Sequence, residues 1–159
     1  MLLRLQTAPS IFLLFVAFLF RSASCGKQDG AKPAPPPTFA FVQSACGPLD
    51  GPAIEFYFTG KQVQPGSHEE PYLVISVNEN LPTSGPQDYS IKPSSYAVLA
   101  SRCLGPGRCD AAISGNLHLA TFNLGKGASG EYELYFEDGK LEMRSFDASW
   151  FSGKPLICG

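Results

Sequence analysis

The stretch from Glu131 to Phe146 reads EYELYFEDGKLEMRSF and decides the fold class of the chain. Apolar and polar residues alternate on both sides of Asp138-Gly139, which is the pattern of two β-strands joined by a tight turn. Asp-Gly favours a two-residue type I′ turn, because both central residues of that turn adopt positive φ. The stretch therefore predicts an antiparallel β-hairpin.

A two-residue turn at Asp138-Gly139 also fixes which residues of the two strands face each other. The predicted pairs on the apolar face are Phe136 with Leu141, Leu134 with Met143, and Tyr132 with Ser145. The predicted pairs on the other face are Glu137 with Lys140, Tyr135 with Glu142, and Glu133 with Arg144. Two of the latter join opposite charges, and such a pair contributes a few tenths to about 1 kcal/mol.

The rest of the chain after Phe39 shows the same period of two. Gly and Pro are scattered evenly between short apolar stretches, and no stretch keeps a 3.6-residue apolar period for three turns. Strands are expected near residues 39–42, 53–59, 72–77, 96–103 and 116–122, whereas the Gly-rich run 125–131 is expected to be a loop. The pattern predicts a single all-β domain over residues 39–159, built as an antiparallel β-sandwich or barrel.

Four of the five cysteines lie in this domain and allow three pairings. Cys103 and Cys109 bracket Leu-Gly-Pro-Gly-Arg, a segment short and flexible enough to fold back on itself. This leaves Cys46 to pair with Cys158, which staples the two ends of the domain. The spacings are long and irregular and contain no CxxC, so we expect two structural disulfides rather than a metal or redox site.

An apolar run from Ile11 to Phe20 precedes the first cysteine. It is about 10 residues long, which suits the core of a signal peptide and is too short to cross a bilayer. The small residues Ser22, Ala23 and Ser24 follow it and fit a peptidase cleavage site just before Cys25. Residues 1–24 are therefore predicted to be a signal peptide.

The sequence from Ser22 to Cys25 resembles the lipobox of bacterial lipoproteins. The resemblance implies that the Cys25 thiol carries a diacylglycerol, which anchors the protein to a membrane and places it in the cell envelope. The domain also resembles small bacterial lipoproteins in the Cys-Gly-Pro that begins at Cys46 and in the terminal Ile-Cys-Gly. Ordinary cleavage and plain secretion fit the same small residues and remain the alternative.

The segment from Cys25 to Thr38 is polar and rich in proline. Its three consecutive prolines favour extended polyproline geometry, and the segment lacks the apolar residues needed to form a core. We expect a spacer between membrane and domain; the alternative is a Pro-rich ligand for a partner's aromatic groove.

Candidate functional side chains are few. His68 lies in a turn-like loop beside two glutamates, and His118 lies on a predicted strand on the same face as Asn116. Tyr135 and Trp150 are aromatic residues of the kind that form sugar- or protein-binding surfaces, although packing alone explains such residues in sheets. No nucleophile elbow, P-loop or dinucleotide motif is present, so no catalytic residue, cofactor or metal is predicted.

Charge argues against a nucleic-acid partner. Removal of residues 1–24 takes away two of the 12 basic residues and leaves the 14 acidic residues in clear excess. No basic patch is evident, and phosphate binding requires one.

These features favour an exported, lipid-anchored envelope protein that binds or scaffolds an unidentified protein or glycan partner. The alternative is a small extracytoplasmic hydrolase or carbohydrate-active enzyme, which requires His118 or His68 to meet carboxylates in a cleft. A structural or inhibitor-like protein without a ligand is a third hypothesis, which the sequence does not separate from the first.

Overall fold

The computed structural model describes residues 39–62, 71–151 and 158, so the predicted signal peptide, the tether with Cys25, and His68 lie outside the described residues. The described residues form no helix and eight strands. These are β1 (Phe39–Cys46), β2 (Pro52–Thr59), β3 (Tyr72–Val77), β4 (Gln87–Ile91), β5 (Val98–Gly105), β6 (Arg108–Asn123), β7 (Gly127–Phe136) and β8 (Leu141–Trp150).

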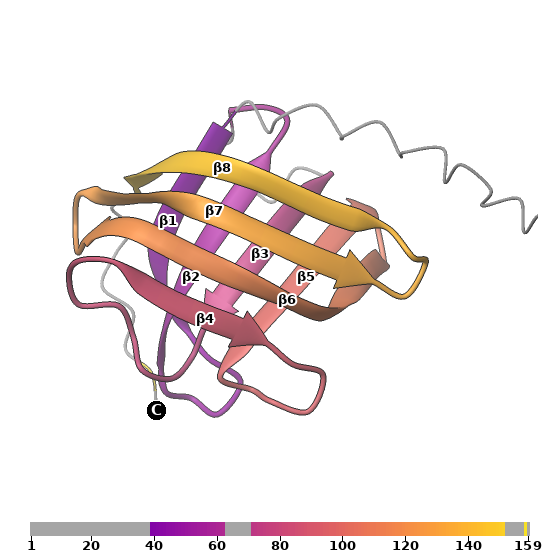
Figure 1. The fold of residues 1–159 in the computed structure, drawn as a ribbon, viewed down its shortest axis with the longest axis horizontal. Coiled ribbons are helices and arrows are strands. Elements are labelled where there is room, and N and C mark those ends of the chain that lie inside the picture. Colours follow the sequence, from indigo (N-terminus) through magenta and orange to yellow (C-terminus); the bar gives the residue numbers. More distant parts are fainter. Residues whose placement is uncertain (1–38, 63–70, 152–157, 159) are drawn as a thin grey trace, which may run out of the picture. The chain divides into compact units, whose positions relative to one another are not determined.

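Seven of the strands close into a β-barrel, and β4 is an extra strand paired with β6. The order around the barrel is β6-β5-β3-β2-β1-β8-β7, and a further pairing of β7 with β6 completes the circuit. In Figure 1 the strands β4, β6, β7 and β8 run across the strands β1, β2, β3 and β5. Neighbours are antiparallel except β1 and β8, which meet in a short parallel contact. The predicted all-β, barrel-like domain is thus confirmed.

The inward faces of both layers share one hydrophobic core. Phe56, Phe58 and Ile75 are buried on the inward face, as the period of two predicts, and Tyr57 and Thr59 on the other face of β2 are buried as well. The ring of Phe58 contacts those of Tyr132 and Phe146 from the opposite layer. Burying a side chain of this size contributes about 1.5–3 kcal/mol, so these contacts hold the two layers together.

Several expected strand boundaries are wrong: β1 extends to Cys46 rather than ending near residue 42, and β6 begins at Arg108 rather than near residue 116. β5 begins at Val98 rather than at Tyr96, which is 62% exposed. The run 125–131 belongs mostly to β7, and only residues 124–126 connect β6 to β7. Glycine lowers the intrinsic preference for a strand, but here it permits a close approach between strands that a side chain would block.

The β7–β8 hairpin is present, but its predicted turn is wrong. The loop has three residues, because the Phe136 N–H donates to the Lys140 carbonyl at 3.0 Å and the Gly139 N–H donates to the Phe136 carbonyl at 3.0 Å. Gly139 has a φ of 76°, whereas Asp138 does not adopt the positive φ that a type I′ turn requires. The loop is therefore a three-residue hairpin with a left-handed glycine at its end.

The extra loop residue shifts the pairing by one, so the predicted cross-strand pairs are wrong as well. Tyr135 lies opposite Leu141, Leu134 opposite Glu142, Glu133 opposite Met143, and Tyr132 opposite Arg144. A shift of one residue moves every side chain of a strand to its other face. In the observed register β8 buries Phe146 and Ala148, while Leu141 and Met143 are 43% and 58% exposed. The observed register thus places Phe146 and Ala148 in the core and Glu142 within reach of Arg102.

Glycines allow β6 and β7 to bend around the barrel. The pairing of β6 with β7 is irregular at Ala112/Ser114 and at Leu119/Thr121. A Cβ on Gly130 would lie 2.0 Å from the His118 carbonyl oxygen, and one on Gly115 would lie 2.2 Å from the Glu133 carbonyl oxygen. Bulges and strand glycines of this kind introduce the curvature that closes a sheet.

We expect Gly130→Ala to lower the free energy of unfolding by about 1–3 kcal/mol, because the added methyl group must push β7 away from β6. Urea denaturation followed by circular dichroism measures this change. Gly51→Ala is the matched control, since nothing lies within 4 Å of a Cβ at Gly51. Equal stability of the two variants would contradict the role of close strand approach.

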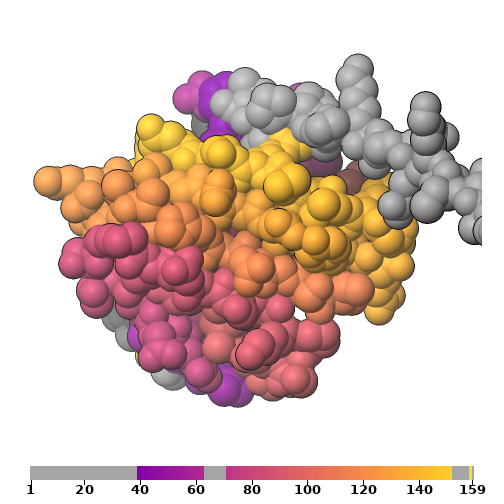
Figure 2. Space-filling model, viewed as in Figure 1, coloured from indigo at the N-terminus to yellow at the C-terminus, as the bar shows by residue number. Residues whose placement is uncertain are grey.

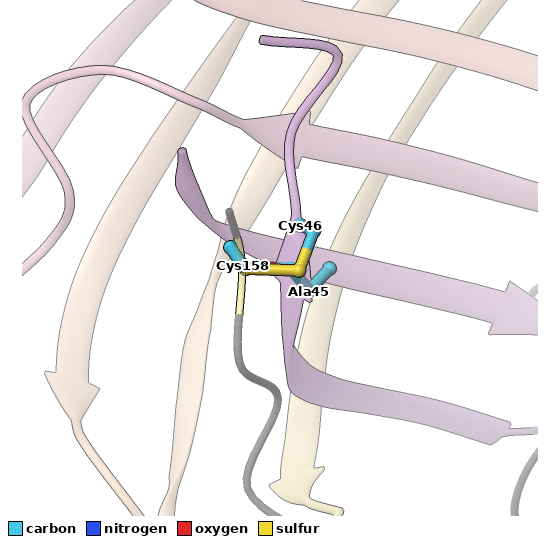
Figure 3. The surroundings of a disulfide bond; sticks show 3 residues. All are labelled: Ala45, Cys46 and Cys158. Carbon is cyan, nitrogen blue, oxygen red and sulfur yellow. A yellow bond between two sulfur atoms is a disulfide. The ribbon is translucent and has the colours of Figure 1, made fainter. Parts of the chain in front are cut away.

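Both predicted disulfides are present. Cys46 and Cys158 are joined with a Cα–Cα distance of 5.6 Å and a sequence separation of 112. Figure 3 shows this bond beside Ala45 at the end of β1. Cys103 and Cys109 face each other across the β5–β6 ladder with a Cα–Cα distance of 4.0 Å. In the chain-entropy model a closed loop of about 100 residues stabilises a fold by up to about 4.7 kcal/mol.

One end of the barrel interior is occupied by Arg102, which follows Val98 and Ala100 on the inward face of β5. Only 4% of its side chain is exposed, and its guanidinium carbon lies 4.1 Å from the centre of the Phe136 ring. The guanidinium donates to Asp138 at 2.7 Å, to Asp110 at 3.2 Å and to Glu142 at 3.4 Å. These carboxylates come from the β7–β8 loop, β6 and β8, so one side chain ties three elements to β5.

The charges of this cluster stabilise one another. Burial alone would lower the pKa of the Arg102 guanidinium, but hydrogen bonds to Asp138, Asp110 and Glu142 outweigh it, and the pKa is raised. Asp138 also binds the Lys140 ammonium at 2.9 Å. Hydrogen bonding to Lys140, followed by Arg102, lowers the pKa of Asp138 to about 2 from an ordinary 3.8.

The depressed pKa of Asp138 predicts an acid-sensitive fold. Its contribution to stability is complete above the ordinary pKa of 3.8 and is lost as the pH falls toward about 2. We expect Asp138→Asn to be less stable than the natural chain at neutral pH, with the difference shrinking between these two pH values. Asparagine keeps an oxygen for the Lys140 N–H but places an amide N–H where Oδ2 accepts from Arg102 and Lys140, so it removes the charge together with these two hydrogen bonds. Urea denaturation at several pH values tests this, and a difference independent of pH would contradict it.

Candidate functional site

The outer face of β4, β6, β7 and β8 carries two rows of mostly polar side chains. The ladders align Asp88, His118, Glu131 and Ser145 in one row, and Ser90, Asn116, Glu133 and Met143 in the next. These side chains point outward because the alternate positions of the same strands, such as Leu117 and Leu134, are fully buried. Figure 2 views the molecule from the side on which these strands lie. We call the two rows, together with Tyr135, the His118 face.

His118 is held in position by a carboxylate from the neighbouring strand. Its Nδ1 lies 2.6 Å from Asp88 Oδ1, and the two side chains are 44% and 84% exposed. Glu131 lies directly opposite His118 on the other side, on β7. The hydrogen bond to Asp88 orients the imidazole and leaves its second nitrogen for another partner.

The second row and Tyr135 extend this arrangement. Ser90 donates a hydrogen bond to Asn116 Oδ1 at 3.3 Å. The Tyr135 hydroxyl donates to Glu133, and this hydrogen bond is the main reason that the pKa of Tyr135 is raised. Tyr135 is 41% exposed and lies beside Leu141 on β8. The face therefore combines fixed polar groups with an exposed aromatic ring.

A depression of about 540 Å³ lies in the middle of the face. The outward side chains that line it are Asn116, His118, Glu131, Glu133, Met143 and Ser145. They offer hydrogen-bond donors and acceptors around one apolar thioether, which suits a ligand with many hydroxyl groups. Among the residues that the structure describes, no three histidine, cysteine or carboxylate side chains are grouped to hold a metal ion.

The structure brings together two of the three predicted binding residues. His118 and Tyr135 lie on the same outer face. Trp150 lies elsewhere: it is partly buried against the core and packs edge-on against Phe122, with ring centres 6.2 Å apart. Its role in binding is therefore not supported by the geometry, and packing is the role that its contacts show.

Sequence reasoning missed Asp88, the residue that orients His118. Its strand, β4, is only five residues long and was not predicted. The signal in the sequence is weak but present, because Asp88 and Ser90 alternate with Tyr89 and Ile91 as in a half-buried strand. Pairing with a strand about thirty residues away is not visible in such a short pattern.

Comparison with protein-family models, with curated proteins and with solved structures gave no match to this chain. Within the described ranges, the structure contains no apolar helix of the length needed to cross a membrane.

Proposed function

We propose that this chain is an exported, lipid-anchored protein of the cell envelope, and that it acts as a binding module for a glycan. The observation that carries the proposal is the 540 Å³ depression of the His118 face. It presents a histidine, an amide and two carboxylates, together with a methionine, on a sheet whose backbone is fixed by neighbouring strands on both sides.

The chemistry of the depression suits sugar hydroxyl groups. Each hydroxyl both donates and accepts, and Glu131 and Glu133 can accept while Asn116 and His118 can do either. Met143 and the ring of Tyr135 supply apolar surface for the carbon skeleton of a sugar. A protein partner is less well suited, because the centres of protein interfaces are depleted in charged residues and this face carries three carboxylates.

Export is supported by the two disulfides and by the lipobox resemblance at Cys25. Disulfides persist in oxidising compartments outside the cytoplasm. A lipid on Cys25 would hold the barrel at a membrane through the Pro-rich segment, near the polymers of the envelope.

The pair of Asp88 and His118 favours a hydrolase as the second candidate function. A carboxylate that orients a histidine is the arrangement that a general base requires. Within the described residues, however, no nucleophilic side chain is hydrogen-bonded to His118, and both members of the pair are open to solvent. Binding therefore accounts for more of the face than catalysis does.

Co-sedimentation with insoluble peptidoglycan, chitin and cellulose tests both functions in one experiment. We expect the protein to sediment with at least one polymer, and the double variant of Asn116→Ala and His118→Ala to bind about tenfold more weakly, because each lost hydrogen bond contributes about 0.5–1.5 kcal/mol. Arg108→Gln, outside the depression, is the control. Release of soluble reducing sugars that depends on His118 would establish the hydrolase, and unchanged sedimentation of the double variant would exclude this face as the site.

Mass spectrometry of the mature protein tests its export and anchoring. We expect an N-terminus at Cys25 with the added mass of a diacylglycerol, and a Cys25→Ser variant that is not lipidated and leaves the membrane fraction. An N-terminus at Cys25 without added mass would indicate plain secretion. An uncleaved chain with reduced cysteines would contradict export altogether.

A further inference from the structure

A cleft opens in the barrel wall where β6 leaves β5. The β5–β6 ladder runs from Gly105 paired with Arg108 as far as Ser101 paired with Ala111. The β4–β6 ladder starts only at Ile91 paired with Gly115. Between these two ladders β6 has no described ladder partner on this side, and the end of β4 lies across the gap.

The cleft has the size and the walls of a small-molecule site. Its volume is about 800 Å³, within the range of about 300–1,000 Å³ that ligand pockets occupy. Its apolar wall is formed mainly by Ile91, Pro93, Leu99, Ala111, Ala112 and Ile113. Ile113 is 39% exposed and sits at the irregularity between Ala112 and Ser114, so an isoleucine side chain remains in contact with solvent there.

The other end of the cleft is acidic. Asp110, Glu137 and Asp138 line it, with Arg102 buried beside them. Arg102 and Lys140 together neutralise Asp138 and Glu142. Asp110 accepts the hydrogen bonds of the Arg102 guanidinium through Oδ2 alone. Among the described residues, none donates a hydrogen bond to Asp110 Oδ1 or to the exposed carboxylate of Glu137. The remaining cation of the lining, Lys92, comes from the connection that follows β4.

We propose that this cleft binds a small organic cation with an apolar body and a primary ammonium group. The apolar body lies between β5 and β6 against Leu99 and Ile113. The ammonium group binds the free oxygen of Asp110 and the carboxylate of Glu137. This site shares no lining residue with the depression of the His118 face, so the proposal is independent of glycan binding.

The same contacts disfavour neutral and anionic ligands. A neutral ligand covers the carboxylates without replacing their bonds to water, which costs free energy. An anion gains nothing from Arg102, because that guanidinium is already enclosed by three carboxylates. Selectivity for a positively charged ligand is therefore the property to test.

Three molecules of equal length test this selectivity: hexylammonium, 1-hexanol and hexanoate. Each is titrated into the ¹⁵N-labelled, disulfide-bonded protein as exported, and amide shifts are followed by NMR. We expect saturable shifts with hexylammonium at residues 99–102 and 111–113. The other two molecules should bind at least about fivefold more weakly. Equal affinity for hexanol or hexanoate would overturn the proposal, as would hexylammonium shifts confined to the His118 face or the absence of saturable shifts.

Two variants identify the carboxylates. Glu137→Gln, at an exposed loop position, should raise the dissociation constant of hexylammonium about threefold, which is the effect of a partly exposed ion pair. Asp110→Asn should raise it further, provided that its NMR spectrum stays dispersed; if it unfolds, Glu137→Gln decides. Glu79→Gln, outside the lining of the cleft, is the matched control and should leave the affinity unchanged. Unchanged binding by Glu137→Gln would overturn the assignment.

Discussion

The packing at one end of the barrel depends on the buried guanidinium of Arg102. An unpaired charge in this position would be costly, so the side chain is stable only when its carboxylate partners are in place. Asp110, Asp138 and Glu142 are separated along the chain and meet only in the folded barrel. The need of Arg102 for carboxylate partners also constrains the β7–β8 hairpin. The one-residue shift from the predicted register turns Glu142 toward Arg102. Core packing and the ion cluster therefore select the same register.

Much of the fold follows from local patterns in the sequence. β2 and β3 are predictable because short apolar runs with a period of two form them, and the Cys103–Cys109 bond is predictable because its loop is short and contains glycine and proline. The hairpin register is not, since Asp138-Gly139 suits both a two-residue turn and the last two positions of a three-residue loop. The burial of Phe146 and the contact of Glu142 with Arg102 distinguish these, and both depend on the whole barrel.

The candidate site was predictable to a smaller extent. The outward position of His118 beside Asn116 follows from the period of β6, and the structure confirms it. Its partner Asp88 depends on the pairing of a five-residue strand with a distant one, for which the sequence contains no local signal. Trp150 could be placed on the inner or the outer face only once the register of β8 was known.

Both candidate sites arise from one topological event, the departure of β6 from β5 toward β4. If β5 had stayed paired with β6 along its whole length, the wall would have no gap beside Ile113. β4 would then have no place on β6, and Asp88 would not reach His118. The irregularity between Ala112 and Ser114 lies at this point of departure, where a bulge re-aims a strand between two neighbours. A single long strand thus forms one wall of the cleft with its first half and carries the histidine with its second.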